Sequence, residues 1–444
     1  MTQMPSRAQE LKARLANRTA TIAVVGLGYV GLPLVRAMHA AGFQVIGFDL
    51  DEKKIQMLKA GTTYLHHLGA DLVPTISASD RFRATNNPEE LGQADAVILC
   101  VPSPLGKHNE PDLAYIIEST RIVAESLHLG QLVSLESTTY PGTTRGDCQP
   151  ILEATGLVCG EDFFLAYSPE REDPGRKDKD TRTIPKLVGG VDAVSTELAG
   201  EMYRAAVDEV VCVDSAEIAE SAKLLENIYR AVNIALVNEL KPVLQDMGID
   251  IWKVVDAAAT KPFGFQAFYP GPGLGGHCIP IDPFYLTWKA KEYHHNTRFI
   301  ELAGEINSNM PAYVVRRTAE GLNQLSKAIR GSRILVVGIA YKPDVDDVRE
   351  TPAAAIIKLL ADQGADVSYH DPHVPSFPKM RKYNFRMDSA DLTKEYVKRC
   401  ECVVIATNHS TIDWQLIADN AELVVDTRNV MATLERVNAI VVQA

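Results

Sequence analysis

The stretch TIAVVGLGYVG, residues 21–31, decides the fold class of this chain of 444 residues. The apolar run at 21–26 indicates a buried strand, and the residues from Gly31 onward indicate an amphipathic helix. Between strand and helix, Gly26, Gly28 and Gly31 form the pattern GxGxxG. A strand, a glycine-rich turn and a helix in this order predict the first unit of a parallel sheet.

Each glycine of this pattern has a physical role at a dinucleotide-binding turn. Gly26 permits the tight turn, Gly28 lets the backbone approach a pyrophosphate, and Gly31 lets the helix pack closely on the strand. The N–H groups at the start of the helix, near Tyr29 and Val30, suit phosphates. The pattern therefore predicts a dinucleotide site. The alternative is the glycine-rich turn of a nucleotide-free domain.

An acidic residue at the end of the next expected strand indicates which dinucleotide binds. Asp49 follows the glycine pattern by 18 residues. A carboxylate there accepts hydrogen bonds from the adenosine ribose hydroxyls and repels a 2′-phosphate, so NAD is expected in preference to NADP. Lys53 and Lys54 weaken this preference, and Lys54 is included in the expected cofactor site.

The order of apolar and helical segments predicts the whole architecture. Short apolar runs alternate with helical patterns through residue 214, then 216–248 reads as one long amphipathic helix, 296–325 is helical again, and the alternation returns at Arg333. We expect an α/β protein in which two Rossmann-like, doubly wound domains are joined by a long central helix and a helical domain. The expected domain boundaries are 1–214, 215–325 and 326–444.

The bulk composition argues against several kinds of partner. Hydrophobic residues make up 46 %, charged residues 23 %, and the net charge is −12, so neither nucleic acid nor a membrane is expected to bind. No apolar run approaches the ~20 residues of a membrane helix, and the charged N-terminus is not a signal peptide. Seven scattered cysteines without a CxxC pair indicate reduced thiols in a cytoplasm and no metal site. All of them except Cys278 are expected to be small buried side chains.

The C-terminal alternation lacks the glycine pattern but carries cations near the equivalent turn. Lys342 and Arg349 follow its first expected strand, and such cations suit the phosphates of a second nucleotide. The alternative is a purely structural domain with surface charges.

One cysteine lies in an unusual loop, GGHCIPIDP, residues 275–283. Gly275 and Gly276 leave the backbone free to crowd a ligand, and two prolines stiffen the loop. A thiol held in this way beside a hydride acceptor indicates covalent catalysis on a carbonyl by Cys278. His277 is its neighbour in sequence and is not favoured as a general base, because adjacent side chains rarely aim at one another.

Other polar residues fall where a catalytic cleft is expected. Lys223 and Asn227 are four apart on the long helix and share a face. There they could stabilise an oxyanion, although a solvated helix face would also explain them. Glu170 follows an expected strand, and Ser137 and Thr138 end another, at the edge of the sheet where ligands bind.

The motifs VVGLGYVGLPL, ESTTYPGTT, SPERED, AKLLENIYRAVNIALVNEL and GGHCIPIDP together resemble the UDP-glucose/GDP-mannose dehydrogenase family. The resemblance covers nearly the whole chain. It implies a four-electron oxidation of a nucleotide sugar's C6 alcohol to a carboxylate, with two NAD⁺ and one water, by an obligate dimer or larger homo-oligomer that serves surface polysaccharide synthesis.

The resemblance also implies roles for single residues. Cys278 would trap the aldehyde as a thiohemiacetal, Lys223 and Asn227 would stabilise oxyanions, and Asp282 would activate water. Thr138 and Glu170 would hold water and assist proton transfer. The expected cofactor site also includes Val101, Pro102, Ser103, Thr138 and Arg349. The expected substrate site includes Glu170, Lys223, Asn227, Phe268, Tyr269, Gly275, Gly276 and Lys342.

Two departures from the UDP-glucose branch point to the substrate. Ile281 stands where that branch carries lysine before the aspartate, and the loop at 261–276 holds several aromatic residues. These features resemble the branch that oxidises UDP-N-acetylhexosamines, most closely the UDP-N-acetyl-D-glucosamine 6-dehydrogenases. UDP-glucose, UDP-N-acetylmannosamine and UDP-N-acetylgalactosamine remain alternatives. A two-electron hydroxyacid dehydrogenase and a non-catalytic NAD-binding protein are less favoured, because neither needs the thiol.

Overall fold

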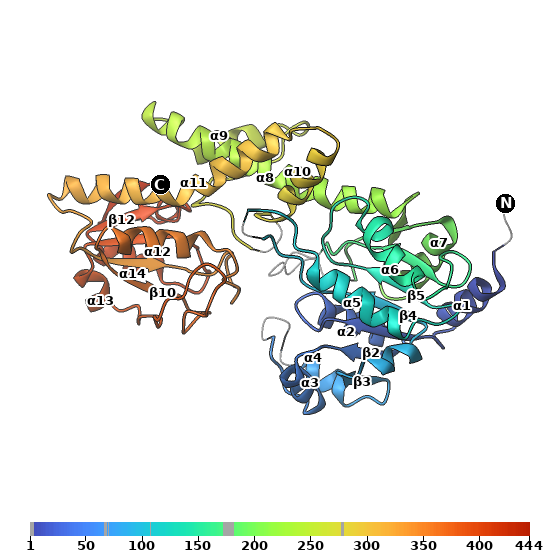
Figure 1. The fold of residues 1–444 in the computed structure, drawn as a ribbon. Helices are drawn as coiled ribbons and strands as arrows, with labels where there is room; N and C mark the ends of the chain where they lie inside the picture. The colour runs from blue at the N-terminus through green and yellow to red at the C-terminus, as the bar shows by residue number, and fades with distance from the viewer. Residues whose placement is uncertain (1–3, 66–68, 70, 107, 172–181, 277–278) are drawn as a thin grey trace. The chain divides into compact units, whose positions relative to one another are not determined.

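The computed structural model describes residues 4–65, 69, 71–106, 108–171, 182–276 and 279–444. The chain forms two compact units, which are described separately (Figure 1). The first contains residues 1–226 and 284–295, and the second contains residues 227–283 and 296–444. The expected three-domain boundaries stay a prediction.

The first unit is built on an eight-stranded sheet with the order β3-β2-β1-β4-β5-β6-β7-β8. The strand order reverses between β1 and β4, which is the crevice where such sheets bind ligands at the carboxyl ends of their strands. The strands are β1 (Thr21–Val25), β2 (Gln44–Phe48), β3 (Phe82–Thr85), β4 (Ala96–Leu99), β5 (Leu132–Leu135), β6 (Phe164–Tyr167), β7 (Lys186–Gly190) and β8 (Val210–Cys212).

Two features of this sheet differ from the expectation. Strand β3 is an additional edge strand, paired in parallel with β2. Strand β7 runs antiparallel to β6, so the expected all-parallel sheet is wrong at this pair. A parallel pair needs a crossover connection, usually a helix, and the described part of the β6–β7 connection contains none.

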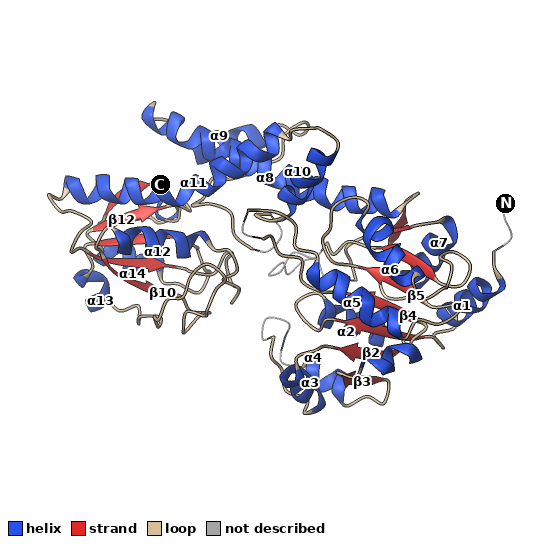
Figure 2. Cartoon of the chain, in the orientation of Figure 1, coloured by secondary structure: helices blue, strands red, loops and turns tan. Residues whose placement is uncertain are grey.

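Helices cover both faces of the first sheet (Figure 2). One core lies under α1, α2, α3, α4 and α7, and the other lies under α5, α6 and the first turn of α8. This doubly wound arrangement confirms the expected fold class. The helices are α1 (Ser6–Ala16), α2 (Gly31–Ala40), α3 (Glu52–Lys59), α4 (Leu72–Ser77), α5 (Ala114–Glu125), α6 (Gln149–Glu153) and α7 (Ala193–Arg204).

The second unit holds a five-stranded parallel sheet with the order β10-β9-β11-β12-β13. Helices α11 and α12 pack on one face, and α13 and α14 pack on the other. The elements are β9 (Arg333–Val337), α12 (Pro352–Asp362), β10 (Asp366–His370), α13 (Lys394–Arg399), β11 (Cys402–Ile405), α14 (Trp414–Asn420), β12 (Leu423–Asp426) and β13 (Ile440–Gln443).

Long helices form the middle of the chain, as the sequence predicts. Helix α8 (Ala216–Asp246) has 31 residues, and the first unit ends within it. The others are α9 (Ile251–Ala259), α10 (Asp282–Glu292) and α11 (Arg298–Gln324). None of the helices in the described part of the chain is long and apolar enough to cross a membrane.

A buried lysine lies in the helical part of the second unit. The Lys241 ammonium lies 4.6 Å from the centroid of the Trp252 ring. The residue is 1 % exposed, and its ammonium has no hydrogen-bond partner among the described residues. Burial lowers the pKa of Lys241 to about 7, although Asp426 attracts its charge.

We predict that Lys241→Met stabilises the protein most at low pH. Between pH 7 and 10 the unfolded lysine holds a proton that the folded one has lost, so the stability of the wild type rises with pH over this range. The gain from the substitution should therefore be roughly 2–4 kcal/mol at pH 6 and shrink towards pH 10. Denaturant unfolding at several pH values measures it, with the exposed Lys59→Met as control. A gain that does not change with pH would contradict the buried charge.

Candidate active site

The glycine turn has the geometry of a dinucleotide site. Gly26 has φ +90°, and a Cβ on it would lie 2.4 Å from the carbonyl oxygen of Cys100 at the end of β4. A Cβ on Gly31 would lie 1.8 Å from the Gly26 carbonyl oxygen, whereas a Cβ on Gly28 would meet nothing within 4 Å. Gly26 and Gly31 are therefore needed by the fold itself, and Gly28 leaves an open approach to the backbone.

The acid expected at the ribose lies beside this turn. The Asp49 carboxylate accepts a hydrogen bond of 2.9 Å from the Leu27 N–H and one of 2.9 Å from the Lys54 ammonium. Tyr64 donates to the Leu27 carbonyl oxygen at 2.6 Å. Sequence reasoning missed Tyr64, whereas it included Lys54 in the expected cofactor site.

The other expected cofactor residues follow β4 and β5. Ser137 Oγ donates to the Val101 carbonyl oxygen at 2.6 Å, and the Val101 N–H lies 3.0 Å from the same Oγ. This contact joins the carboxyl ends of the two strands. Ser103 is buried, Pro102 is exposed and Thr138 is half-buried.

In the first unit, the expected catalytic lysine is held by the expected catalytic glutamate. The Lys223 ammonium donates a hydrogen bond of 2.5 Å to the Glu170 carbonyl oxygen, and Lys223 is 6 % exposed. One turn earlier on α8, the buried Glu220 accepts from the Gly142 N–H at 2.6 Å and from the Thr144 hydroxyl at 2.7 Å. Burial raises the pKa of Glu220 to about 7, against the lowering by these hydrogen bonds. The start of α8 is thereby fixed to the loop after β5.

In the second unit, α8 supplies the expected amide. Asn227 Nδ2 donates to Asp282 Oδ2 at 2.6 Å, and the exposed fractions are 4 % for Asn227 and 0 % for Asp282. The structure thus brings together the two residues expected to act on an oxyanion and on water. Cys278 and His277 lie outside the described residues.

The two glycines that precede His277 and Cys278 in the sequence, Gly275 and Gly276, pack closely against Tyr341. A Cβ on Gly275 would lie 2.6 Å from Tyr341 Cβ, and one on Gly276 would lie 2.9 Å from the same ring. The Gly276 N–H also donates to the Arg349 carbonyl oxygen at 2.9 Å. Because Gly275 and Gly276 have no side chain, this part of the loop can pack closely on the segment after β9. The role of both glycines in substrate binding stays a prediction.

The remaining expected site residues have partners within the second unit. Arg349 forms a two-pronged ion pair with Asp347, with Nε and Nη2 at 2.9 and 2.6 Å from Oδ2. Lys342 is half-buried. The Phe268 ring packs edge-on to Tyr229, and the Tyr269 hydroxyl donates to Asp256 at 2.7 Å.

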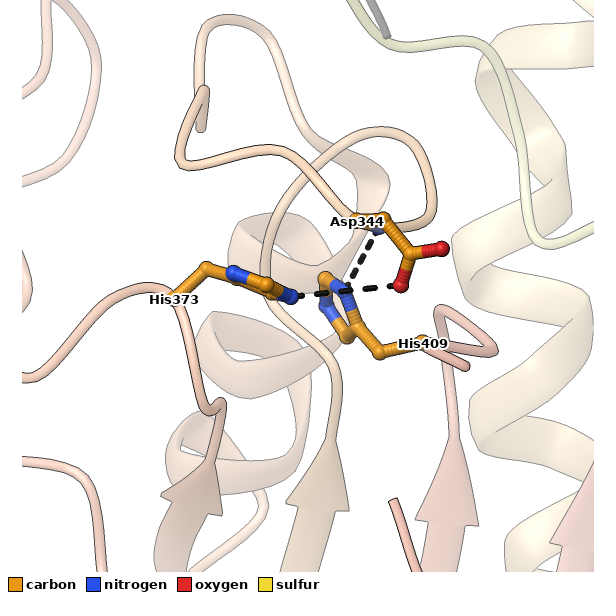
Figure 3. A group of neighbouring side chains, drawn as sticks. All are labelled: Asp344, His373 and His409. Atoms are coloured by element: carbon orange, nitrogen blue, oxygen red, sulfur yellow. Dashed lines mark hydrogen bonds and ion pairs between the residues drawn. The ribbon is translucent and has the colours of Figure 1, made fainter. Parts of the chain in front are cut away.

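A further polar cluster lies at the carboxyl ends of β9, β10 and β11 (Figure 3). His409 Nδ1 accepts from the Asp344 N–H at 3.0 Å, and its Nε2 lies 3.0 Å from Asp371 Oδ2. His373 Nε2 lies 3.9 Å from Asp344 Oδ1. Both ring nitrogens of the buried His409 are engaged within the protein, so the cluster is organised as a hydrogen-bond network and offers a cation no free nitrogen of His409.

Glu170 lies next to a buried network of charged and polar side chains that the sequence did not reveal. The Lys186 ammonium is 2.7 Å from Glu136 Oε2 and 3.9 Å from Glu170 Oε2. The Tyr203 hydroxyl donates to Glu136 Oε1 at 2.6 Å. The sequence signal that could have revealed this network is one charged residue inside each of two expected strands. These residues are Glu136 in SLEST and Lys186 in PKLVGG.

The cysteines follow the expectation only in part. Of the six cysteines among the described residues, four are buried, Cys159 is half-buried and Cys212 is exposed. The Cys212 sulfur accepts a hydrogen bond from Arg204 at 3.4 Å. The expectation of burial is wrong for Cys212, which ends the edge strand β8.

These features define a class of protein. A doubly wound sheet with a built dinucleotide turn, a second parallel sheet and a long helix that belongs in part to each unit are typical of NAD-dependent dehydrogenases. Models of the UDP-glucose/GDP-mannose dehydrogenase family match residues 20–207 (NAD binding domain), 217–309 (central domain) and 335–433 (UDP binding domain). The chain belongs to this family.

Similar proteins support this assignment. The chain is 38 % identical to "Protein CapL" of Staphylococcus aureus over 87 % of this chain and 89 % of that one. It is 37 % identical to a UDP-N-acetyl-D-glucosamine 6-dehydrogenase of Pseudomonas aeruginosa, over 82 % and 85 %. The structure of a UDP-D-ManNAc dehydrogenase from Pyrococcus horikoshii superimposes with a TM-score of 0.84 at 31 % identity, covering 95 % and 98 %.

The protein is therefore an NAD-dependent UDP-sugar dehydrogenase, an oxidoreductase that acts on a CH–OH group. The hydroxyacid dehydrogenase and the non-catalytic protein left open by the sequence do not fit these matches. The residues of the first unit fit NAD, because the turn at Gly28 is open to a pyrophosphate and Asp49 lies next to it.

We predict opposite outcomes for two glycine substitutions in this turn. Gly31→Ala places a Cβ 1.8 Å from a carbonyl oxygen, so it should destabilise the first unit by several kcal/mol or prevent folding. Gly28→Ala meets no protein atom within 4 Å, so it should fold normally and bind NAD at least tenfold more weakly. Thermal unfolding and NAD titration measure both. Normal NAD affinity in a folded Gly28→Ala would move the cofactor away from this turn.

Proposed function

We propose that the enzyme oxidises the C6 hydroxyl of a UDP-N-acetylhexosamine to the uronate, with two NAD⁺ and one water. The sugar that we favour is UDP-N-acetyl-D-glucosamine. The observation that carries the proposal is the helix α8. It places Lys223 and Asn227 one turn apart, and each is fixed by a residue of the expected site, Glu170 and Asp282 respectively.

Names of similar proteins and one sequence feature support the sugar. Relatives include dehydrogenases of UDP-N-acetyl-D-glucosamine and of UDP-N-acetyl-D-mannosamine. Ile281, which is 4 % exposed, occupies the position before Asp282. The second candidate is UDP-N-acetyl-D-mannosamine, because the structural neighbour at TM-score 0.84 is described as a dehydrogenase of that sugar.

The first oxidation removes a hydride from C6 and a proton from its hydroxyl, giving the aldehyde. NAD⁺ supplies the two-electron acceptor when it is bound at the glycine turn. The chain must stabilise the negative charge that develops on the C6 oxygen. The Lys223 ammonium is suited to this role because it is buried and held in one direction by the Glu170 carbonyl. A preorganised donor in a water-poor site is worth roughly 10²–10³ in rate.

The second oxidation requires a covalent intermediate on the protein. The Cys278 thiolate adds to the aldehyde carbon, and a proton goes to the C6 oxygen to give a thiohemiacetal. Loss of a second hydride and that proton leaves a thioester, which water cleaves to the carboxylate and the free thiol. Asp282 would take the proton from this water. The 2.6 Å hydrogen bond from Asn227 fixes the orientation of the Asp282 carboxyl group.

We further propose that the enzyme is a homodimer formed through α8. Six exposed apolar side chains on this helix fall within an arc of about 60° around its axis at 3.6 residues per turn. They are Ile218, Leu225, Tyr229, Leu236, Leu240 and Val243. A stripe this long is self-complementary in a two-fold arrangement of two α8 helices.

We place the enzyme in the cytoplasm, because its chemistry needs a reduced thiol. We also propose that it takes part in the supply of surface polysaccharide precursors.

We predict two NADH per UDP-N-acetyl-D-glucosamine consumed, with UDP-glucose a poor substrate. Absorbance at 340 nm and chromatography of the sugar measure the ratio, and UDP-N-acetyl-D-mannosamine is tested beside it. Cys278→Ala should bind NAD normally and form no uronate. One NADH per sugar would contradict the four-electron reaction. Preference for the mannosamine would keep the chemistry and exchange the sugar.

We predict that Leu236→Glu dissociates the dimer, because it buries a charge in the proposed seam. Light scattering should then give half the wild-type mass. Leu129→Glu is the matched control, since Leu129 is 49 % exposed and Leu236 is 50 % exposed. A wild type that is monomeric, or a Leu236→Glu variant of unchanged mass, would contradict the α8 interface.

A further inference from the structure

A buried ammonium in the first unit lies between two carboxylates. The Lys186 side chain is 6 % exposed and sits at the start of β7. Its Nζ is 2.7 Å from Glu136 Oε2 and 3.9 Å from Glu170 Oε2. Glu136 follows β5 in the chain and its side chain is completely buried, whereas the Glu170 side chain is 17 % exposed. Lys186 therefore connects a carboxylate in the core to one at the surface of the proposed site.

The network behind Lys186 is anchored in the core. Glu136 Oε1 accepts from the Tyr203 hydroxyl of α7 at 2.6 Å, and that hydroxyl lies 2.9 Å from Ser134 Oγ on β5. The Tyr203 ring also lies under the ammonium, with 5.3 Å between Nζ and the ring centroid. Residues of β5, of the segment after it and of α7 thus fix the position of Lys186.

The charges are arranged to keep Lys186 cationic. Burial lowers the pKa of Lys186, but attraction by Glu136 and Glu170 outweighs burial and raises it overall. Burial raises the pKa of Glu136 and Lys186 opposes this. The Cys100 thiol also faces this group, and burial raises its pKa well above the usual value. Lys186 therefore carries its charge throughout the working pH range.

Glu170 is the link between this network and the helix α8. Its carboxylate faces Lys186, and its backbone carbonyl accepts the 2.5 Å hydrogen bond from Lys223. On the solvent side, the next residue, Arg171, pairs with Glu226 of α8 at 2.7 Å. A shift of Glu170 would move the acceptor that fixes the Lys223 ammonium.

We propose that Lys186 is a positioning residue for the oxidation, which holds the Glu170 carboxylate in place and, through the Glu170 carbonyl, orients Lys223. The inference rests on the proposed roles of Glu170 and Lys223. A structural role alone is a weak reason for the buried pair of Lys186 and Glu136, because a buried ion pair often adds no net stability over apolar residues of the same size. The contact with Glu170 distinguishes this group from such a pair.

The test compares variants that separate charge from packing. Lys186→Met leaves Glu136 uncompensated and can fail to fold. The double variant Lys186→Met/Glu136→Gln removes both charges and keeps an acceptor for Tyr203, so it should fold. Lys241→Met is the matched control, because it removes a buried lysine from the other unit. Glu170→Gln reports directly on the carboxylate.

The expected result is a specific loss of turnover. The double variant should bind NAD as the wild type does, keep KM for the UDP-sugar within about threefold, and lose about tenfold or more in kcat. Glu170→Gln should show the same pattern, a loss in kcat with KM nearly unchanged. Lys241→Met should leave kcat and KM unchanged.

Two results would overturn the proposal, and they differ. A double variant with wild-type kcat and KM, in a series where Glu170→Gln is impaired, would make Lys186 structural and leave the proposed function intact. A fully active Glu170→Gln would remove Glu170 from the reaction, and with it both the proposed role of that residue and the inference for Lys186.

Discussion

The hydrogen bonds that fix the start of α8 to the first sheet are the constraint on which the proposed chemistry depends. Glu220 accepts from the loop after β5, and Lys223 donates to the carbonyl of Glu170 after β6. Since an α-helix repeats every 3.6 residues, Glu220 and Lys223 lie about one turn apart and fix one face of the helix start to these loops. The direction of the Lys223 ammonium therefore depends on this contact.

Lys223, Asn227 and Asp282 are buried, and each has a specific partner. Buried charges are costly unless they are paired, and this chain meets that cost with Lys186 between Glu136 and Glu170 and with Asn227 on Asp282. Lys241 is the contrasting case, because its only close partner among the described residues is the Trp252 ring. Burial accordingly lowers the pKa of Lys241 to about 7.

Sequence patterns predicted the parts of the fold that local physics determines. The glycine turn at 26–31, the helix at 216–246 and the two alternating α/β segments follow from periodicity and from glycine geometry. Strand direction does not, because the reversal at β7 depends on where the chain returns to the sheet. Lys186 was missed for a similar reason. A single charge in an apolar strand becomes meaningful only when Glu136, from a distant strand, is brought against it.

The covalent step at Cys278 is the central claim, and the mass of the protein during turnover tests it most directly. Asp282→Asn should remove the group that activates water and so leave the thioester unhydrolysed. After incubation with UDP-N-acetyl-D-glucosamine and NAD⁺, we expect its intact mass to rise by the mass of the UDP-sugar acyl group, on the peptide that contains Cys278. The rise should be absent without NAD⁺ and absent in Cys278→Ala/Asp282→Asn. An Asp282→Asn enzyme that turns over as the wild type does, or stops after two NADH with no added mass, would contradict the covalent mechanism.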